Sequence, residues 1–283
     1  MRWMPILVGA LILLPAPAAA SAAPRPRPSR IGIYYSMHGL PRDWRTPYRL
    51  VDGVPMVDYP WGPERNPVTS AQYGLAVYSL WVAYHDPGRL HQAVRVADWL
   101  VRTQAADGKW LFEFAFQPPG SDTLASGWSS ALAQGQAVSL LERVYHWRPR
   151  PRYLRAIHRS LRPLQRTVEQ GGLARFWEGN LYFEEYSTPQ PNYVLNGDGQ
   201  ALIGLYEAEP LDPAARRLLT RGADGLAHTL DLFDSHQGRS YYNAVSKTFP
   251  PPSYDVIIRM MLRQLTRMTG RQIFAQYAGI WNG

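Results

Sequence analysis

The sequence predicts a mainly α-helical fold, an incomplete α/α toroid of helical hairpins with short β-hairpins in its loops. Three observations carry this prediction. Seven segments place apolar residues at helical spacing and follow one another in loose pairs, and their connections are rich in aromatic residues. The chain of 283 residues is 46% hydrophobic, enough to bury a sizeable core. The segments share no exact short repeat, which argues against a solenoid of consensus units.

The chain opens with a segment typical of export. Arg2 precedes an apolar run that is too short to span a bilayer, and small residues follow it. We therefore expect residues 1–23 to be a signal peptide, cleaved after Ala20 or Ala23. The alternative is an uncleaved N-terminal anchor.

The remaining chain divides into two parts. Residues 24–48 form a Pro- and Arg-rich leader and an N-terminal arm, and residues 49–283 form one helical domain. No other stretch approaches a membrane span. We expect an exported protein, periplasmic or secreted, with no stable insertion into the membrane once the signal is cleaved.

Local signals place each element of this domain. Asn66 and Pro67 predict the first helix, with an N-cap asparagine followed by proline at the first helical position. Residues 109–116 alternate like a strand, and residues 173–186 look extended on both sides of a glycine turn. The other helices are expected at about 89–105, 127–147, 151–169, 197–208, 212–231 and 255–270.

The segment 151–169 carries a stripe of arginines. They recur at spacings of three and four, on the side opposite the apolar residues, at Arg152, Arg155, Arg159, Arg162 and Arg166. The stripe is either a surface for a polyanion or the solvated back of a helix, and the export signal argues against nucleic acid as a partner. Pro163 is expected to kink this helix.

Several kinds of site are excluded by composition. The chain has no cysteine, which removes disulfides, thiolate catalysis and cysteine metal sites. The seven histidines show no metal-ligand spacing, and no phosphate-binding or dinucleotide-binding loop is present. We therefore expect neither a metal nor a cofactor. The net charge of +8 suits an anionic partner.

Four blocks of sequence carry a family resemblance. They are DGVPMVDYP leading into NPVTSAQYGLAVYS (52–79), GWSSALAQGQAVSLLERVY (127–145), YFEEYSTPQPNYVLNGDGQALIGLYE (182–207) and LFDSHQGRSYY (232–242). In this order they resemble the C-terminal catalytic domain of D-glucuronyl C5-epimerases. These enzymes convert D-glucuronate to L-iduronate within heparan-type polysaccharides.

The resemblance implies a set of catalytic residues. Glu185 and Tyr186 match the family's functional pair, and Tyr241 matches another active-site tyrosine. In a flat strand Glu185 and Tyr186 would point to opposite faces, because successive side chains alternate. The match to the family's pair therefore requires a local bend after Glu184. Ordinary roles stay open: an exposed carboxylate edge for the pair, and packing for Tyr241.

Two departures from the family pattern affect this set. An arginine is expected at position 244, where this chain has Ala244. A further catalytic tyrosine is either displaced to Tyr254 or lost. We retain Tyr254 as the fourth catalytic candidate.

The substrate-binding candidates also have structural alternatives. Gln134 either reaches sugar hydroxyls or bridges neighbouring loops, and Trp128 either stacks on a sugar or fills the core. Asn196 either caps a helix or lines the cleft. Asn66 and Gln72, in the first block, complete the set.

The implied reaction inverts C5 of D-glucuronate in an acidic, heparosan-like polysaccharide by removing and returning a proton. It needs a base on one face of the sugar ring, a proton donor on the other, and neutralisation of the sugar carboxylate. Two alternatives remain: a non-catalytic carbohydrate-binding protein on the same fold, and a lyase that eliminates from the same carbanion. The sequence leaves the oligomeric state open.

Overall fold

The computed structural model describes residues 32–118 and 120–282. The predicted signal peptide lies outside these residues. The described part contains the helices α1 (Pro67–Tyr84), α2 (Pro87–Thr103), α3 (Ala131–Trp147), α4 (Pro151–Ser160), α5 (Leu195–Ala208), α6 (Pro213–Thr229), α7 (Pro252–Thr269) and α8 (Gln272–Ile280). None of these helices is long and apolar enough to cross a bilayer.

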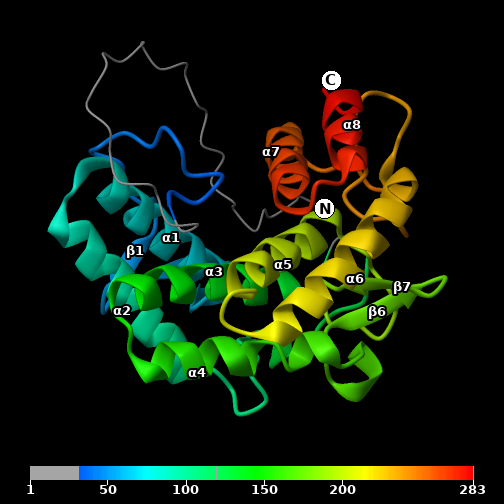
Figure 1. The fold of residues 1–283 in the computed structure, drawn as a ribbon. Helices are drawn as coiled ribbons and strands as arrows, with labels where there is room; N and C mark the ends of the chain where they lie inside the picture. Colours follow the sequence, from blue (N-terminus) through cyan, green and yellow to red (C-terminus); the bar gives the residue numbers. More distant parts are fainter. Residues whose placement is uncertain (1–31, 119, 283) are drawn as a thin grey trace, which may run out of the picture.

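The helices form four successive hairpins arranged as an open ring (Figure 1). The inner helices α1, α3, α5 and α7 pack against one another in that order, and the second helix of each hairpin lies outside. Among the described residues, no packing of comparable extent joins α7 back to α1. The fold is therefore the incomplete α/α toroid that the sequence predicts.

Short antiparallel strands occupy the loops. β1 (Arg49–Val51), β2 (Val54–Tyr59) and β3 (Gly62–Glu64) form a small sheet ahead of α1, and β4 (Leu111–Phe112) pairs with β5 (Trp128–Ser129). β6 (Ala174–Trp177) and β7 (Asn180–Phe183) form the expected hairpin, with Gly179 in its turn at φ +84°. The predicted strand over residues 109–116 is reduced to the two residues of β4.

Glycines bring the two central helices into contact. A Cβ added to Gly135 on α3 would lie 2.1 Å from the backbone oxygen of Gln200 on α5, and one added to Gly204 would lie 2.5 Å from the oxygen of Gly135. Neither position can carry a side chain without separating the helices. This crossing forms the centre of the ring.

The ends of α3 and α5 that follow this crossing are held by a buried ion pair. Both terminal nitrogens of Arg143 donate to the carboxylate of Glu207, at 2.7 and 2.8 Å. The N-terminal arm covers this region, where the Tyr34 hydroxyl donates to Gln200 Oε1 at 2.6 Å. Residues of the arm are thus part of the core.

Two helix boundaries and one whole helix differ from the prediction. α4 stops at Ser160 instead of continuing with a kink, because Pro163 has no N–H to extend the helix; two 3₁₀ turns, Pro163–Gln165 and Val168–Gln170, follow. α3 begins at Ala131, since the preceding Trp128 belongs to β5. α8 is not predicted at all.

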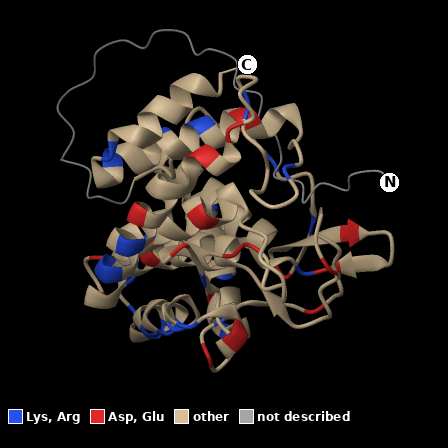
Figure 2. Cartoon of the chain, turned by 90° about the vertical axis from the view of Figure 1, so that its right-hand side faces the viewer, with Lys and Arg blue, Asp and Glu red and all other residues tan. Residues whose placement is uncertain are grey.

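The arginine stripe is correspondingly divided between α4 and the following turns. Arg152 donates to Asp98 at 2.7 Å, and Arg159 donates to Gln104 at 3.0 Å. Figure 2 shows residues of both charge signs spread over the helices. Part of the stripe is therefore engaged with neighbouring side chains of the protein itself.

Candidate active site

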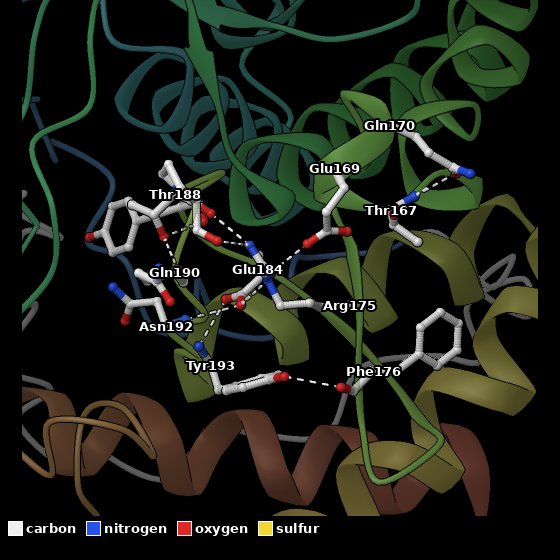
Figure 3. Close-up of polar contacts among 12 residues, drawn as sticks. Thr167, Glu169, Gln170, Arg175, Phe176, Glu184, Thr188, Gln190, Asn192 and Tyr193 are labelled. Carbon is white, nitrogen blue, oxygen red and sulfur yellow. Dashed lines mark hydrogen bonds and ion pairs between the residues drawn. The ribbon is translucent and has the colours of Figure 1, made fainter.

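The two consecutive glutamates after β7 have different surroundings. The strand ends at Phe183 and the chain bends at residues 185–186, which confirms the expected local bend. The carboxylate of Glu184 accepts hydrogen bonds from the backbone nitrogens of Asn192 and Tyr193, at 3.0 and 2.8 Å, and pairs with Arg175 Nε at 3.1 Å (Figure 3). Glu184 therefore holds the loop that follows it.

Glu185 instead lies in a cluster of aromatic rings. It is 4% exposed, and its Oε1 accepts a hydrogen bond from the Tyr242 hydroxyl at 3.3 Å. The hydroxyls of Tyr186 and Tyr242 are in turn hydrogen-bonded at 2.8 Å. A carboxyl and two phenols thus form one buried chain of hydrogen bonds.

Burial raises the pKa of Glu185 to about 7, although hydrogen bonds from Tyr186, Tyr242 and Asn196 oppose the rise. Near neutral pH this carboxyl can therefore exist in either protonation state. A group whose pKa lies near the working pH is suited to act as a general base.

The tyrosines of the cluster stay protonated over the same pH range. Burial raises the pKa of Tyr186 and of Tyr242, and the charge of Glu185 raises both further. The same two causes, in the same order, raise the pKa of Tyr254. Burial and this charge therefore favour the neutral phenols, which can donate hydrogen bonds and protons.

Tyr254 reaches the cluster from the first turn of α7. Its ring lies 6.0 Å from that of Tyr242, nearly perpendicular to it, and the side chain is largely buried. The position predicted for a displaced catalytic tyrosine therefore lies beside the other candidates.

Tyr241 does not join them. Its ring packs on Phe249 at 5.1 Å and lies beneath the ammonium of Lys247, and its backbone nitrogen bonds to Phe233. The adjacent Tyr242 contacts Glu185 in its place. Of the pair Tyr241–Tyr242, it is therefore Tyr242 that is hydrogen-bonded to Glu185, and a catalytic role for Tyr241 stays a prediction.

The pairing of this segment with the start of α5 explains why only one of the two tyrosines lies beside Glu185. Residues 240–244 run beside the start of α5: Leu195 N bonds to Tyr242 O, and Ala244 N bonds to Tyr193 O. Along such a segment neighbouring side chains point to opposite sides, so only one tyrosine of the pair can face Glu185. The residue types alone do not say which.

The predicted binding residues fall into distinct environments. Asn196 is buried against Glu185, and since the N-cap of α5 is Val194, it is not the helix cap. The following Gly197 lets the chain approach: an added Cβ would lie 2.3 Å from that of Glu185. Asn196 thus lies beside the candidate catalytic carboxyl and stays a candidate for substrate binding.

Asn66 has a structural role. Its Oδ1 accepts from the backbone nitrogens of Val68 and Thr69, which confirms the predicted N-cap, and its Nδ2 donates to the Tyr59 hydroxyl at 2.8 Å. Gln72, six residues further along the chain on α1, is only partly buried. In the described part of the chain, neither side chain is hydrogen-bonded to Glu185.

Gln134 bridges loops, as in its structural alternative. It is fully buried; its Oε1 accepts from Trp110 N at 3.1 Å, and its Nε2 donates to Gly108 O and Ser160 O, each at 3.0 Å. The carbonyl oxygen of this amide and both hydrogens of its Nε2 are therefore bonded to backbone groups of the protein. Gln134 therefore reaches no ligand in this arrangement.

Trp128 is a buried residue that packs among the aromatic side chains next to Tyr186. Its ring stacks on Phe112 at 3.7 Å, its Nε1 donates to Phe114 O at 3.0 Å, and it lies 5.8 Å from the ring of Tyr186. Phe116 also stacks on Trp128. Phe112, Phe114 and Phe116 are alternate residues of the predicted strand over 109–116, so they lie on one side of it. Phe116 and Trp128 pack beside the ring of Tyr186.

The N-terminal ends of all four inner helices meet at this cluster. Val68 of α1, Leu132 of α3, Val194 before α5 and Tyr254 of α7 belong to one hydrophobic group with Tyr186 and Tyr242. Helix N-termini carry partial positive charge, which favours an anionic group between them. These helix ends are therefore a source of positive potential at the cluster.

In the described residues, no group of three His, Asp or Glu side chains could hold a metal ion. The arrangement instead provides a carboxyl with a raised pKa, neutral phenols and helix ends. Such a set can remove a proton from carbon and return one, provided that the resulting negative charge is stabilised.

Comparisons with known proteins identify the family of this chain. A family model described as the D-glucuronyl C5-epimerase C-terminus matches residues 104–283. A D-glucuronyl C5-epimerase of Caenorhabditis elegans is 30% identical over 166 residues, which cover 53% of this chain and 27% of that protein. An uncharacterized protein of Methanocaldococcus jannaschii is 28% identical over 178 residues, 61% of this chain and 56% of that one. The matched part of this chain thus spans about a quarter of the length of the Caenorhabditis elegans protein and about half of the length of the Methanocaldococcus jannaschii protein.

Two solved structures share the fold. An unsaturated glucuronyl hydrolase of a Bacillus species matches with a TM-score of 0.50 at 17% identity, over 76% of this chain and 60% of that one. Cellobiose 2-epimerase of Spirochaeta thermophila matches with a TM-score of 0.53 at 12% identity, over 77% and 57%. Identities this low show the fold alone.

Proposed function

Because the chain belongs to the family defined by the D-glucuronyl C5-epimerase C-terminus, we propose that it is a carbohydrate epimerase that inverts C5 of D-glucuronate residues in an acidic, heparosan-like polysaccharide. The observation that carries the proposal is the contact of Glu185 with Tyr242 and Tyr186 at the N-terminal ends of the inner helices.

In this proposal Glu185 is the base. The C5 proton of a uronate is weakly acidic, because the carbanion forms beside a carboxylate, and a desolvated carboxylate is a stronger base than one in water. The raised pKa of Glu185, about 7, reflects this desolvation. Proton transfer by a placed side chain typically accelerates a reaction by about 10²–10⁴-fold.

The phenols act as neutral donors. Tyr242 donates its one hydroxyl proton to ionised Glu185; once Glu185 has taken up the C5 proton, this hydroxyl is free to donate to the negative charge on the sugar. Tyr254 on the separate helix α7 is the candidate for giving a proton to C5 from the other face, and proton exchange with solvent then returns Tyr254 to the phenol and Glu185 to the carboxylate. The helix ends and the Asn196 amide assist with the substrate's own carboxylate.

The alternatives differ in the fate of the carbanion once the proton has been removed. A lyase would expel the substituent at C4 and leave a double bond, and a binding protein would not exchange the proton. The convergence of Glu185, Tyr186, Tyr242 and Tyr254 favours proton chemistry over binding alone.

The test is isotope exchange with a glucuronate polymer in heavy water. An epimerase incorporates deuterium at C5 and generates L-iduronate without an unsaturated product. Mass spectrometry measures the deuterium, and ultraviolet absorbance measures any unsaturated product. A rise in the absorbance of a conjugated double bond would identify a lyase instead. No incorporation with any uronate polymer of a panel would reject both activities.

We also propose that the protein is exported, on the basis of the apolar segment within residues 1–23. Fractionation of the expressing cells and N-terminal sequencing test this. A new N-terminus at residue 21 or 24 in the exported fraction supports the proposal. An intact N-terminus in the cytoplasmic fraction contradicts it.

A further inference from the structure

The turn between β2 and β3 presents an exposed tryptophan. Tyr59 pairs with Gly62, which leaves Pro60 and Trp61 as a two-residue loop. Trp61 is 53% exposed, whereas tryptophan side chains are usually buried to a large extent. Its exposure is therefore unusual.

The ring of Trp61 is nevertheless held in place. It stacks on the ring of Tyr59 with centroids 4.9 Å apart and planes 8° apart, and it lies 5.9 Å from Phe114. Tyr59 is fixed in turn by the hydrogen bond from Asn66, the N-cap of α1, and Pro60 restricts the loop backbone. One face of Trp61 is thus covered by Tyr59, and the high exposure of the residue leaves the other face to solvent.

This ring is continuous with the candidate active site. Phe114 lies 4.8 Å from Tyr59 and 6.2 Å from Trp128, and Trp128 lies 5.8 Å from Tyr186. Three ring-to-ring contacts therefore lead from Tyr59, beneath Trp61, to the catalytic candidates. The open face of Trp61 lies at the outer end of this row.

We propose that Trp61 is a stacking platform for a sugar unit of the same polysaccharide, at a distance along the polymer from the unit that reacts; this rests on the proposed function. A pyranose ring presents a face of C–H groups, and such a face packs well on the negatively polarised face of an indole. A rigid aromatic platform binds with little loss of side-chain entropy. It positions the polymer without touching the reacting atoms.

The chain provides a matched control. Trp147, at the end of α3, is 51% exposed and also packs against another aromatic ring, that of Trp81 at 4.7 Å. It lies at the opposite end of its helix from the active-site cluster. Replacing either tryptophan removes a similar exposed surface, but only Trp61 adjoins the candidate site.

The experiment compares Trp61→Ala, Trp61→Phe and Trp147→Ala for binding of a glucuronate polymer by calorimetry at high salt, where attraction between charges is screened. We expect Trp61→Ala to weaken binding about tenfold or more, with partial recovery in Trp61→Phe. Trp147→Ala is expected to bind as the wild type does. Where isotope exchange is measurable, Trp61→Ala raises KM for the polymer and leaves kcat within about twofold.

Equal affinity of Trp61→Ala and the wild-type protein, or equal weakening in Trp147→Ala, would overturn the platform. Thermal melting identifies any variant that fails to fold, and Trp61→Phe then decides. The two proposals fail separately. If binding depends on Trp61 but no isotope exchange occurs, the platform is supported and the epimerase is rejected. If exchange occurs and Trp61→Ala leaves KM unchanged, the epimerase is supported and the platform is rejected.

Discussion

Glu185→Gln should stabilise the protein at alkaline pH while abolishing its activity. The wild-type carboxyl is buried, and its pKa rises from 4.5 in the unfolded chain to about 7 in the folded protein. The folded state therefore holds a proton that the unfolded chain has already lost. Glutamine resembles the protonated carboxyl and cannot ionise.

The magnitude follows from linkage. Below about pH 4.5 both states are protonated, and Glu185 causes no loss of stability. As the pH rises toward about 7, only the unfolded chain ionises and the free energy of unfolding falls. Above about pH 7 the loss is complete, at about 3 kcal/mol for a rise in pKa from 4.5 to about 7.

The assay is urea unfolding of the wild type and of Glu185→Gln at about pH 5 and about pH 8. The variant should gain about 2–3 kcal/mol relative to the wild type between the two pH values, because effects that do not depend on pH cancel in this comparison. Exposed Glu113 provides the control, and Glu113→Gln should change stability by less than about 0.5 kcal/mol at both pH values. A pH-independent difference for Glu185→Gln would refute the reasoning.

Two further predictions concern side chains that the structure reassigns. Tyr242→Phe removes the hydroxyl between Glu185 and Tyr186 and should lower kcat for isotope exchange by about 10²-fold or more. Tyr241→Phe should leave kcat within about twofold of the wild-type value. Equal effects of the two changes on kcat would favour Tyr241 as a catalytic residue as well. Gln134→Ala leaves Trp110 N and Ser160 O without the hydrogen bonds that Gln134 makes to them, while Gly108 O keeps its second partner, Gln104 Nε2; the variant should lower the free energy of unfolding by about 2–5 kcal/mol, measured in urea. A loss below about 1 kcal/mol would contradict the bridging role.

The elements predicted best are those with strong local signals. The Asn66–Pro67 start of α1 and the turn at Gly179 depend on backbone preferences that neighbouring residues fix by themselves. α8 lacks such signals, because the side chain of its N-cap, Arg271, makes no capping hydrogen bond to the first turn of the helix. Its stability comes from packing of Phe274 and Trp281 in the core, which no local pattern records.

The candidate site shows the same division. Glu185 and Tyr186 could be identified from the family resemblance, and their bend from the alternation of side chains along a strand. The choice of Tyr242 over Tyr241 depends on the pairing of residues 240–244 with the start of α5, which lies almost fifty residues away in the sequence. Gln134 was ambiguous because the loops that it joins are distant from it along the chain.

The pH dependence of activity distinguishes Glu185 from a tyrosine as the base. Burial holds the pKa of Tyr186, Tyr242 and Tyr254 above the ordinary phenol value, and the charge of Glu185 adds to this, so that ionisation of Glu185 makes a tyrosinate harder to form. If Glu185 is the base, kcat/KM for isotope exchange should rise with pH through about 7 and then reach a plateau that lasts beyond about pH 9. The profile is measured with one glucuronate polymer at constant ionic strength. A rate that continues to increase tenfold per pH unit above about pH 8 would require a tyrosinate base, and the raised pKa of Glu185 would then have no catalytic role.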